Sequence, residues 1–295
     1  MRDGTIGCNL CCRSRFSLHW LPPVRVFRDP VTGIYPLQDL AVSGLRSQPC
    51  CPKISGALNI LNNRPSRPCK EAYFEAKYLP ERPVKILAVS DMVLDRFYSA
   101  NLRSNYGDVR LVLGCGDLPY EYLEFLVSAL DVPLLYVPGN HDPGYDKAIP
   151  DSQADGCEFL DLRVMHVKGL NIAGMGGSMR YHPGQRNQYT QAEMYTRLLQ
   201  FSPTLWWHQF RHHGGLDILI AHSPPFGIHD DDDMAHIGFS AFISLIHIFK
   251  PRYFLHGHTM VYKSNLVPPV TKNGRTTIIN VYPYRLIELE PAGGR

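Results

Sequence analysis

The residues best suited to chemistry in this chain follow short apolar runs that we predict to be strands. Asp91 follows the first such run, Asp117 the second, and Gly139-Asn140-His141-Asp142 the third; His222 and His258 follow two later ones. Carboxylate, amide oxygen and imidazole together bind divalent cations, and this mixture suits Mn, Fe or Zn better than a thiolate site would. The pattern therefore predicts a divalent-metal site.

The elements that must position these residues alternate in type. The chain begins this region with a β-α-β-α-β pattern, which indicates right-handed crossovers and a parallel sheet, and it ends in alternating strands with a turn at 272–274. Ligands bind outside the carboxyl ends of such strands, so the polar residues should meet at one edge. We predict a mixed α/β architecture with strands over 84–90, 111–113, 134–137, 163–167, 170–174, 216–221, 252–256, 261–265, 275–281 and 285–289, and helices over 94–104, 120–130, 190–200, 203–212 and 237–249.

In their order and placement these motifs resemble the calcineurin-like metallophosphoesterase superfamily, over about residues 84–290. The resemblance implies a four-layer α-β-β-α sandwich with two mixed β-sheets. It also implies a two-metal centre that hydrolyses phosphomonoesters or phosphodiesters. The matching residues are Asp91, Gly116-Asp117, Gly139-Asn140-His141-Asp142, His222 and Gly257-His258.

Two histidines of the superfamily's pattern are absent. Val93 stands where its Asp-x-His motif has histidine, and Met260 stands where its Gly-His-x-His motif ends. The resemblance implies that both histidines serve one metal, with Asp91 and the shared Asp117. A valine and a thioether are poor ligands for such cations. The residues implied for the other metal are all present: Asp117, Asn140, His222 and His258.

The sequence therefore predicts one strong and one weak metal position. Asp95, one helical turn beyond Asp91, and His256, two residues before His258, are candidates to complete the weak one. We expect His141 near the leaving group, as an acid or a charge stabiliser. Asp142 either orients His141 or caps the loop before Pro143, since carboxylates commonly fix the tautomer of an imidazole.

Two residues are candidates for contact with the substrate. Arg180 closes a glycine-rich stretch after a predicted strand, where it either binds a phosphate or is a solvated side chain of a turn. Tyr120 either lines the cleft or packs against neighbouring side chains.

The expected partner is a small phosphate ester, and the expected function is its hydrolysis by a metal-activated water. The alternative is a catalytically weak relative that binds metal or nucleotide as a regulator or scaffold.

Composition separates residues 1–83 from the rest of the 295-residue chain. This segment holds six of the eight cysteines and ten of the 24 prolines, and its net charge is +6 against −3 for the remainder. Because it lacks periodicity, we predict an N-terminal extension of little regular structure, followed by one domain over 84–290. Zinc binding by its cysteines is a second interpretation. A misplaced upstream start is a third, since no methionine lies between Met1 and Met92.

Charge and hydropathy limit the expected partners, and cysteine usage indicates the expected location. A total net charge of +3 is too close to zero for nucleic-acid binding through bulk charge, so we expect no nucleic-acid partner. No run of about 18 apolar residues occurs, so we expect no membrane-spanning helix. Beyond residue 83 the chain has two cysteines, Cys115 and Cys157, on different elements. That usage is typical of a reducing cytoplasm.

Overall fold

The computed structural model describes residues 25–26, 83–143, 152–212, 215–260 and 269–290. The predicted strand over 261–265 and the alternatives for the cysteine-rich extension lie outside these ranges. Within the predicted extension, residues 25–26 form a short strand, β1 (Arg25–Val26), that pairs antiparallel with the last strand of the chain.

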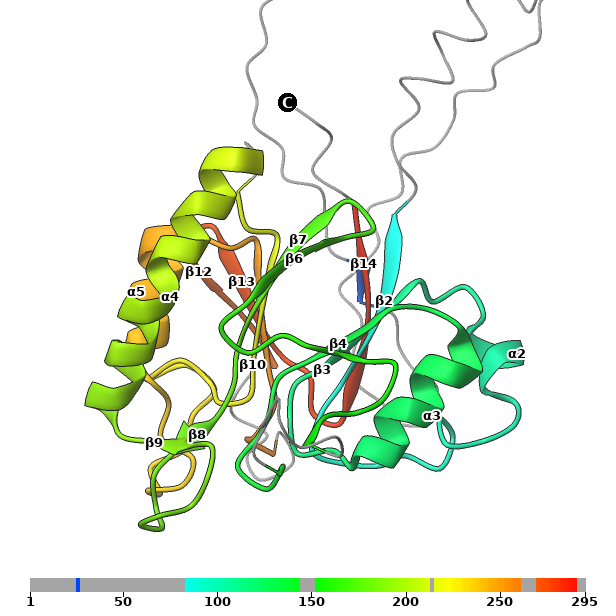
Figure 1. The fold of residues 1–295 in the computed structure, drawn as a ribbon, viewed down its shortest axis with the longest axis horizontal. Helices are drawn as coiled ribbons and strands as arrows, with labels where there is room; N and C mark the ends of the chain where they lie inside the picture. Colours follow the sequence, from blue (N-terminus) through cyan, green and yellow to red (C-terminus); the bar gives the residue numbers. More distant parts are fainter. Residues whose placement is uncertain (1–24, 27–82, 144–151, 213–214, 261–268, 291–295) are drawn as a thin grey trace, which may run out of the picture.

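Two six-stranded mixed sheets form the centre of the fold (Figure 1). The first has the order β1, β14 (Tyr284–Leu289), β2 (Val84–Val89), β3 (Leu111–Gly114), β4 (Leu134–Tyr136) and β5 (Glu158–Phe159). The second has the order β12 (Val270–Asn273), β13 (Thr276–Asn280), β11 (Tyr253–His256), β10 (Ile218–Ala221), β7 (Leu170–Met175) and β6 (Val164–Val167). A small third sheet pairs β8 (Ser178–Met179) with β9 (Gln188–Tyr189).

Helices cover the outer face of each sheet. On the first sheet lie α2 (Leu102–Tyr106) and α3 (Tyr120–Leu130); on the second lie α4 (Gln191–His212) and α5 (Ser240–Phe249), as Figure 1 shows. The predicted four-layer α-β-β-α sandwich with two mixed sheets is therefore confirmed. Within the described ranges no helix has both the length and the apolarity needed to cross a membrane.

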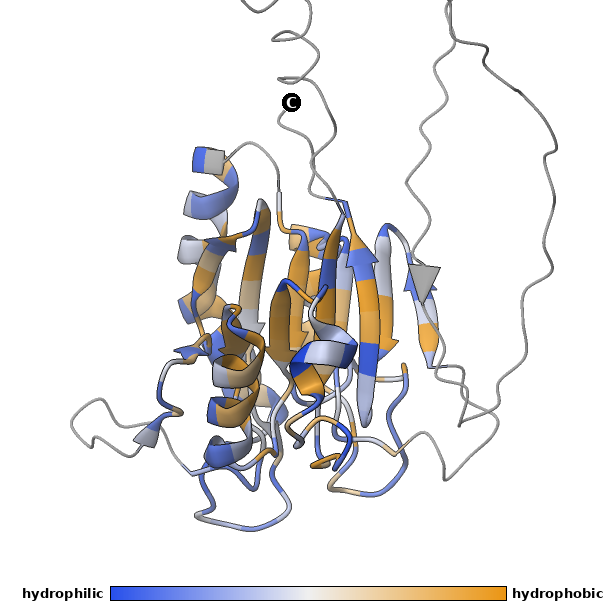
Figure 2. Ribbon diagram, turned by 90° about the vertical axis from the view of Figure 1, so that its right-hand side faces the viewer, coloured by the Kyte–Doolittle hydropathy of each residue, from blue (hydrophilic) through white to orange (hydrophobic). Residues whose placement is uncertain are grey.

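Alternation along the central strands produces three apolar layers. Ile86 and Ala88 of β2 face the other sheet, where they join Ile172 of β7 and Ile220 of β10. The residue between them, Leu87, faces the helices of its own sheet. Strands covered on both faces are apolar throughout, which is why the sequence shows short continuous runs (orange in Figure 2).

The pairing of the central strands brings their carboxyl ends to one edge. β2, β3, β4 and β5 run parallel, and so do β7, β10, β11 and β13. The antiparallel strands β14, β12 and β6 lie at or near the margins. Polar loops gather at this edge (blue, below the strands in Figure 2). The expected parallel beginning and antiparallel end are both present.

Two helix predictions were wrong. The helix expected over 94–104 is a series of turns, and α2 begins only at Leu102. The buried Phe97 there contacts the rings of Tyr106 and Tyr284 edge-on, and Tyr284 lies far along the chain. Local periodicity does not report such a tertiary contact.

The two helices expected over 190–200 and 203–212 are one helix, α4, with Pro203 inside it. Proline removes one helical N–H, which is the reason for expecting a break. Buried residues on both sides of the proline, Leu198, Phe201 and Leu205, pack into one layer against the second sheet. That continuous packing maintains the helix across Pro203.

Candidate metal centre

The candidate ligands occupy loops at the shared carboxyl edge. Asp91 lies two residues beyond β2 and Asp117 three beyond β3, and the Asp91 N–H donates to the carbonyl of Gly116 at 3.1 Å. His222 directly follows β10, and its carbonyl accepts from Gly257 N–H at 3.0 Å, which fixes the loop that carries His258. The loops are therefore bonded pairwise within each sheet.

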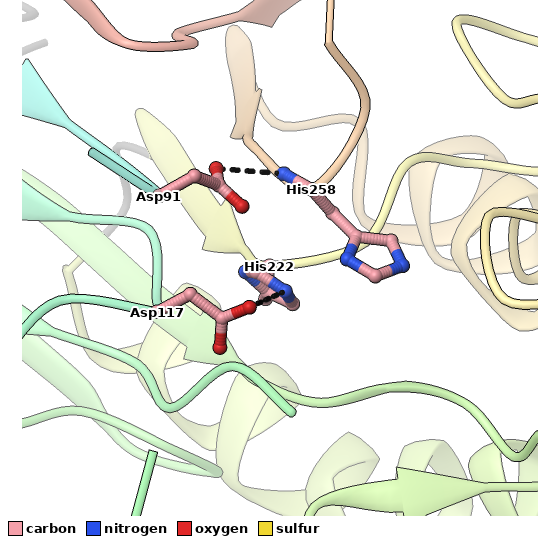
Figure 3. Close-up of side chains that lie close together, drawn as sticks. All are labelled: Asp91, Asp117, His222 and His258. Atoms are coloured by element: carbon pink, nitrogen blue, oxygen red, sulfur yellow. Dashed lines mark hydrogen bonds and ion pairs between the residues drawn. The ribbon is translucent and has the colours of Figure 1, made fainter. Parts of the chain in front are cut away.

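Asp91, Asp117, His222 and His258 converge from both sheets (Figure 3). One ligand atom from each lies within 4.8 Å of those of the other three. The two sheets are joined here, because the backbone N–H of His258 donates to Asp91 Oδ2 at 2.9 Å. Both imidazoles are buried.

Three of these four residues have strained backbones. Asp91, Asp117 and His258 have φ values of 62°, 56° and 66°, in the left-handed region that side chains other than glycine rarely occupy. Each such residue costs on the order of 1–3 kcal/mol, and residues of this kind concentrate at functional sites. The strain turns the side chains at three strand ends toward a common point.

The hydrogen bonds of His222 determine which of its nitrogens can bind a cation. Its Nδ1–H donates to the carbonyl of Cys115 at 2.8 Å, so the lone pair of the neutral ring is on Nε2. That Nε2 lies 3.0 Å from Asn140 Oδ1 and 3.3 Å from Asp117 Oδ2. Three electron-rich atoms thus face one another in a buried place, which is favourable only with a proton or a metal ion between them.

The electrostatics agree with this geometry. Burial by itself lowers the pKa of His222, but the charge and hydrogen bond of Asp117, together with the charge of Asp91, raise it to about 10. Burial likewise acts to raise the pKa of Asp117, yet His222 holds that pKa below its usual range. The site therefore stabilises a buried positive charge, and the donor set of one imidazole, one carboxylate and one amide oxygen fits a divalent cation.

The ring of His258 has the opposite tautomer from that of His222. Its Nε2–H donates to the carbonyl of Ala235 at 2.7 Å, which leaves Nδ1 with the lone pair. Figure 3 shows one ring nitrogen turned toward the other three residues and one turned away. Burial, and then the charge of His222, lowers the pKa of His258. A lowered pKa favours the neutral form of the ring, which is the form that binds a metal.

Asn140 is oriented by a residue that the sequence analysis missed. Its Nδ2 donates to the hydroxyl of Tyr181 at 3.0 Å, which directs Oδ1 toward His222. Tyr181 follows the glycine-rich stretch after β7, at the same edge as the other site residues. Its place just beyond a predicted strand was the available sequence signal, and that signal pointed equally to its neighbour Arg180.

We expect Tyr181→Phe to weaken metal binding about 10- to 100-fold, the usual effect of removing a group that orients a ligand. Without the hydroxyl, Asn140 is free to present its amide nitrogen to the site. Titration of the metal-free protein with Mn²⁺, followed by isothermal calorimetry, measures the change. Tyr98→Phe removes a hydroxyl from an exposed tyrosine whose ring contacts Phe125 edge-on, and serves as the control. Equal affinities in both variants would contradict the assigned role.

His141 and Asp142 lie beside Asp117. The His141 N–H donates to Asp117 Oδ1 at 2.8 Å, and the residue is exposed. Asp142 Oδ2 accepts from the N–H groups of Asp117, at 2.9 Å, and Gly139, at 2.8 Å. These contacts match the loop-capping interpretation of Asp142, which joins the β3 and β4 loops.

The candidates for the weak metal position lie elsewhere. Among the residues that the structure describes, Asp95 and His256 both lie outside the four-residue cluster. Asp95 is exposed, whereas the buried His256 uses Nδ1 to donate to Gly257 O at 3.1 Å and Nε2 to pair with His229 Nδ1 at 2.9 Å. Val93 and Met260 are 38% and 49% exposed. Neither candidate therefore joins Asp91 and Asp117 in the cluster.

The two residues expected to contact substrate have structural partners. Arg180 Nη2 donates to Gln188 O at 3.1 Å and pairs with Glu193 at 2.8 Å, which ties β9 to the start of α4. The Tyr120 hydroxyl donates to Ser152 O at 3.1 Å, and its ring contacts Tyr136 edge-on. The packing interpretation of Tyr120 therefore matches its contacts.

His236 is a second residue near the site that the sequence analysis passed over. Its ring centroid lies 4.9 Å from that of His258, and its Nδ1 pairs with Asp233 Oδ2 at 2.7 Å. The acidic run over 230–233, which includes Asp233, was the available sequence signal. Asp233 holds the ring beside a candidate ligand.

Gly257 lets the second sheet's loop pass directly over the site. A Cβ at this position would overlap Ser90 Oγ and Asp91 Oδ2. The neighbouring His258 N–H could then no longer reach Asp91, although that bond joins the two halves of the cluster. Glycine is required here because of the close approach.

We expect Gly257→Ala to destabilise the protein by roughly 1–3 kcal/mol, the usual cost of overpacking, and to abolish tight metal binding. Thermal unfolding and metal analysis of the purified protein measure the two effects. The control is Gly274→Ala in the β12–β13 turn, where φ is 59° but nothing lies within 4 Å of an added Cβ. It should lose some stability and bind metal normally. Normal metal binding by Gly257→Ala would refute the steric argument.

The chain is similar to a known protein family and to a curated protein. The family described as "Calcineurin-like phosphoesterase" matches residues 84–262, more than half of the chain. The uncharacterized protein MJ1162 of Methanocaldococcus jannaschii is 26% identical over 212 residues, which cover 68% of this chain and 88% of that relative.

Two solved structures are also similar. The protein TT1561 of Thermus thermophilus has a TM-score of 0.45 at 16% identity, and the match covers 68% of this chain and 89% of that one. A second crystal structure has a TM-score of 0.48 at 15% identity, covering 68% and 90%. The family match spans the loops that carry Asp91, Asp117, Asn140, His222 and His258, and it shows that this chain belongs to the calcineurin-like phosphoesterase family.

Proposed function

We propose that the protein is a metal-dependent hydrolase of phosphate esters with one tightly held divalent ion. Asp117, Asn140, His222 and His258 would hold this ion, and Asp91, whose carboxylate lies in the same cluster, would complete the site. The observation that carries the proposal is the convergence of His222 Nε2, Asn140 Oδ1 and Asp117 Oδ2 in a buried place. Mn, Fe and Zn all suit this donor set.

A bound divalent ion would polarise the phosphoryl group and lower the pKa of a water molecule. The chain's own residues would do the rest. Asp142 fixes the Asp117 and Gly139 loops, so the ligands are preorganised. His141, exposed beside Asp117, would donate a proton to the leaving group or stabilise its charge. Its exposure permits this role while its backbone remains part of the ligand scaffold.

Turnover of an aryl phosphodiester and an aryl phosphomonoester, with and without added Mn²⁺, tests the proposal. We expect hydrolysis that a chelator removes and Mn²⁺ restores. His141→Ala should retain metal and lose most of the turnover, whereas His166→Ala, on β6 away from the cluster, should change neither. A metal-loaded protein that hydrolyses neither ester would contradict the proposal.

The second candidate is a catalytically weak relative that binds metal or nucleotide as a regulator. Val93 and Met260, at positions where the family's pattern has ligands, favour it. Tight nucleotide binding without turnover would support this candidate.

For the location of the protein, we propose the reducing cytoplasm, because Cys115 and Cys157 are both free thiols.

A further inference from the structure

Helix α4 is apolar on two faces. Met194, Leu198, Phe201 and Leu205 are buried against the second sheet. Tyr195, Leu199, Pro203, Trp206 and Phe210 recur at intervals of 4, 4, 3 and 4 residues, so they form one line along another side of the helix, and all are exposed. We call this line the α4 stripe. Figure 1 shows α4 as an outer layer of the molecule.

The stripe and two neighbouring exposed residues, Trp207 of α4 and Ile248 of α5, together form an apolar patch. Leu199, Trp206, Trp207 and Phe210 are 72%, 58%, 62% and 76% exposed, and Ile248 of the neighbouring α5 is 53% exposed. The ring centroid of Trp206 lies 6.0 Å from that of Phe249, and the Tyr195 hydroxyl bonds Ser244 of α5 at 3.2 Å, so the patch extends across both helices.

The exposed area matches one side of a protein–protein interface. With roughly 200 Å² for each aromatic side chain and somewhat less for Leu and Ile, the patch exposes about 700 Å². The largest apolar patch on a typical monomer is about 300–600 Å². A standard interface buries about 800 Å² on each partner. The patch is therefore large enough for a stable dimer.

Charge favours a second copy of this chain over a lipid surface. A helix that lies on a membrane carries Lys and Arg along its polar face. Helix α4 has no lysine and two arginines, of which Arg197 is paired with Asp161 at 2.7 Å. The stripe itself contains no charged residue, so covering it desolvates none.

The spacing of the stripe is self-complementary in an antiparallel pair. A two-fold axis midway between Ser202 and Pro203 places Leu199 opposite Trp206 of the second copy, and Tyr195 opposite Phe210. Leu199 then meets the large ring of Trp206, and the rings of Tyr195 and Phe210 meet each other. Two-fold pairing of this kind is the commonest form of protein oligomer. We propose that the protein forms a dimer in which the α4 stripes of two copies pack antiparallel.

Sedimentation equilibrium of the full chain tests the dimer. We expect a dimer at about 100 µM, well above a micromolar Kd. Leu199→Glu and Phe210→Glu should each produce a monomer, because a carboxylate would be buried without a partner. Thr204→Glu, exposed on the same helix but off the stripe, should remain a dimer. These residues are exposed on α4 and none belongs to the metal cluster, so circular dichroism and metal content should be unchanged in all three variants.

Mixing two monomeric variants tests the register. Leu199→Glu and Trp206→Lys should each be monomeric alone, and an equimolar mixture should recover the dimer, since the antiparallel register brings glutamate against lysine. A wild-type monomer at about 100 µM, including one that binds anionic vesicles, would overturn the proposal. So would a dimer that survives both glutamate substitutions, or a mixture that stays monomeric.

Discussion

Asp117→Asn should remove metal and activity while leaving the fold intact. Asp117 Oδ1 accepts from His141 N–H at 2.8 Å, and an asparagine oxygen can keep that bond. The amide nitrogen then takes the place of Oδ2, which lies 3.3 Å from His222 Nε2. Its N–H can donate to that lone pair and occupy the position that a cation needs.

The expected loss is large. Residues that merely orient a ligand change metal affinity about 10- to 100-fold, so replacing a charged ligand should exceed about 100-fold in both metal affinity and kcat/KM. Mass spectrometry of the purified protein gives the metal content, and aryl phosphodiester turnover gives the activity. Thermal unfolding of the metal-free protein should change little.

Asp131→Asn is the matched control. Asp131 has a φ of 58°, close to that of Asp117, but it ends α3, where its backbone N–H donates to Val127 O and its carboxylate is exposed. Asparagine tolerates that backbone conformation equally well. This variant should retain metal and activity. If Asp117→Asn also retained full metal content, the assignment of Asp117 as a ligand would be refuted.

Restoring the two absent histidines should create a second metal position. Val93 and Met260 are 38% and 49% exposed, so imidazoles fit at both places without repacking a core. Each lies two residues beyond a member of the cluster, Asp91 or His258. The double variant Val93→His/Met260→His should raise the tightly bound metal from one to two ions per chain.

A second ion would also allow the substrate to be held from both sides, which supports a rise in turnover. The measurement is metal content after exhaustive dialysis, together with kcat for the phosphodiester. Val93→Phe/Met260→Phe supplies rings without nitrogen and should remain at one ion. Two tightly held ions in the unsubstituted protein, or one in the double histidine variant, would contradict the single-site proposal.

Much of the fold could be predicted because the core repeats one pattern. Strands covered on both faces must be apolar throughout, as Val84–Val89 and Leu111–Gly114 are. Such runs between helical stretches indicate parallel strands, and parallel strands place their following loops at one edge. The order of Asp91, Asp117, Asn140, His222 and His258 along the chain was thus sufficient to predict that they meet.

The sequence by itself determined the identity of the candidate ligands and the absence of histidine at Val93 and Met260. Only the tertiary structure decided how each ligand is held, since the partners are backbone groups and distant side chains. The Cys115 carbonyl selects the tautomer of His222, and Tyr181 orients Asn140. The continuity of α4 across Pro203, and the exposure of Trp206, depend likewise on which faces are packed, because periodicity cannot distinguish an apolar face that is covered from one that is not.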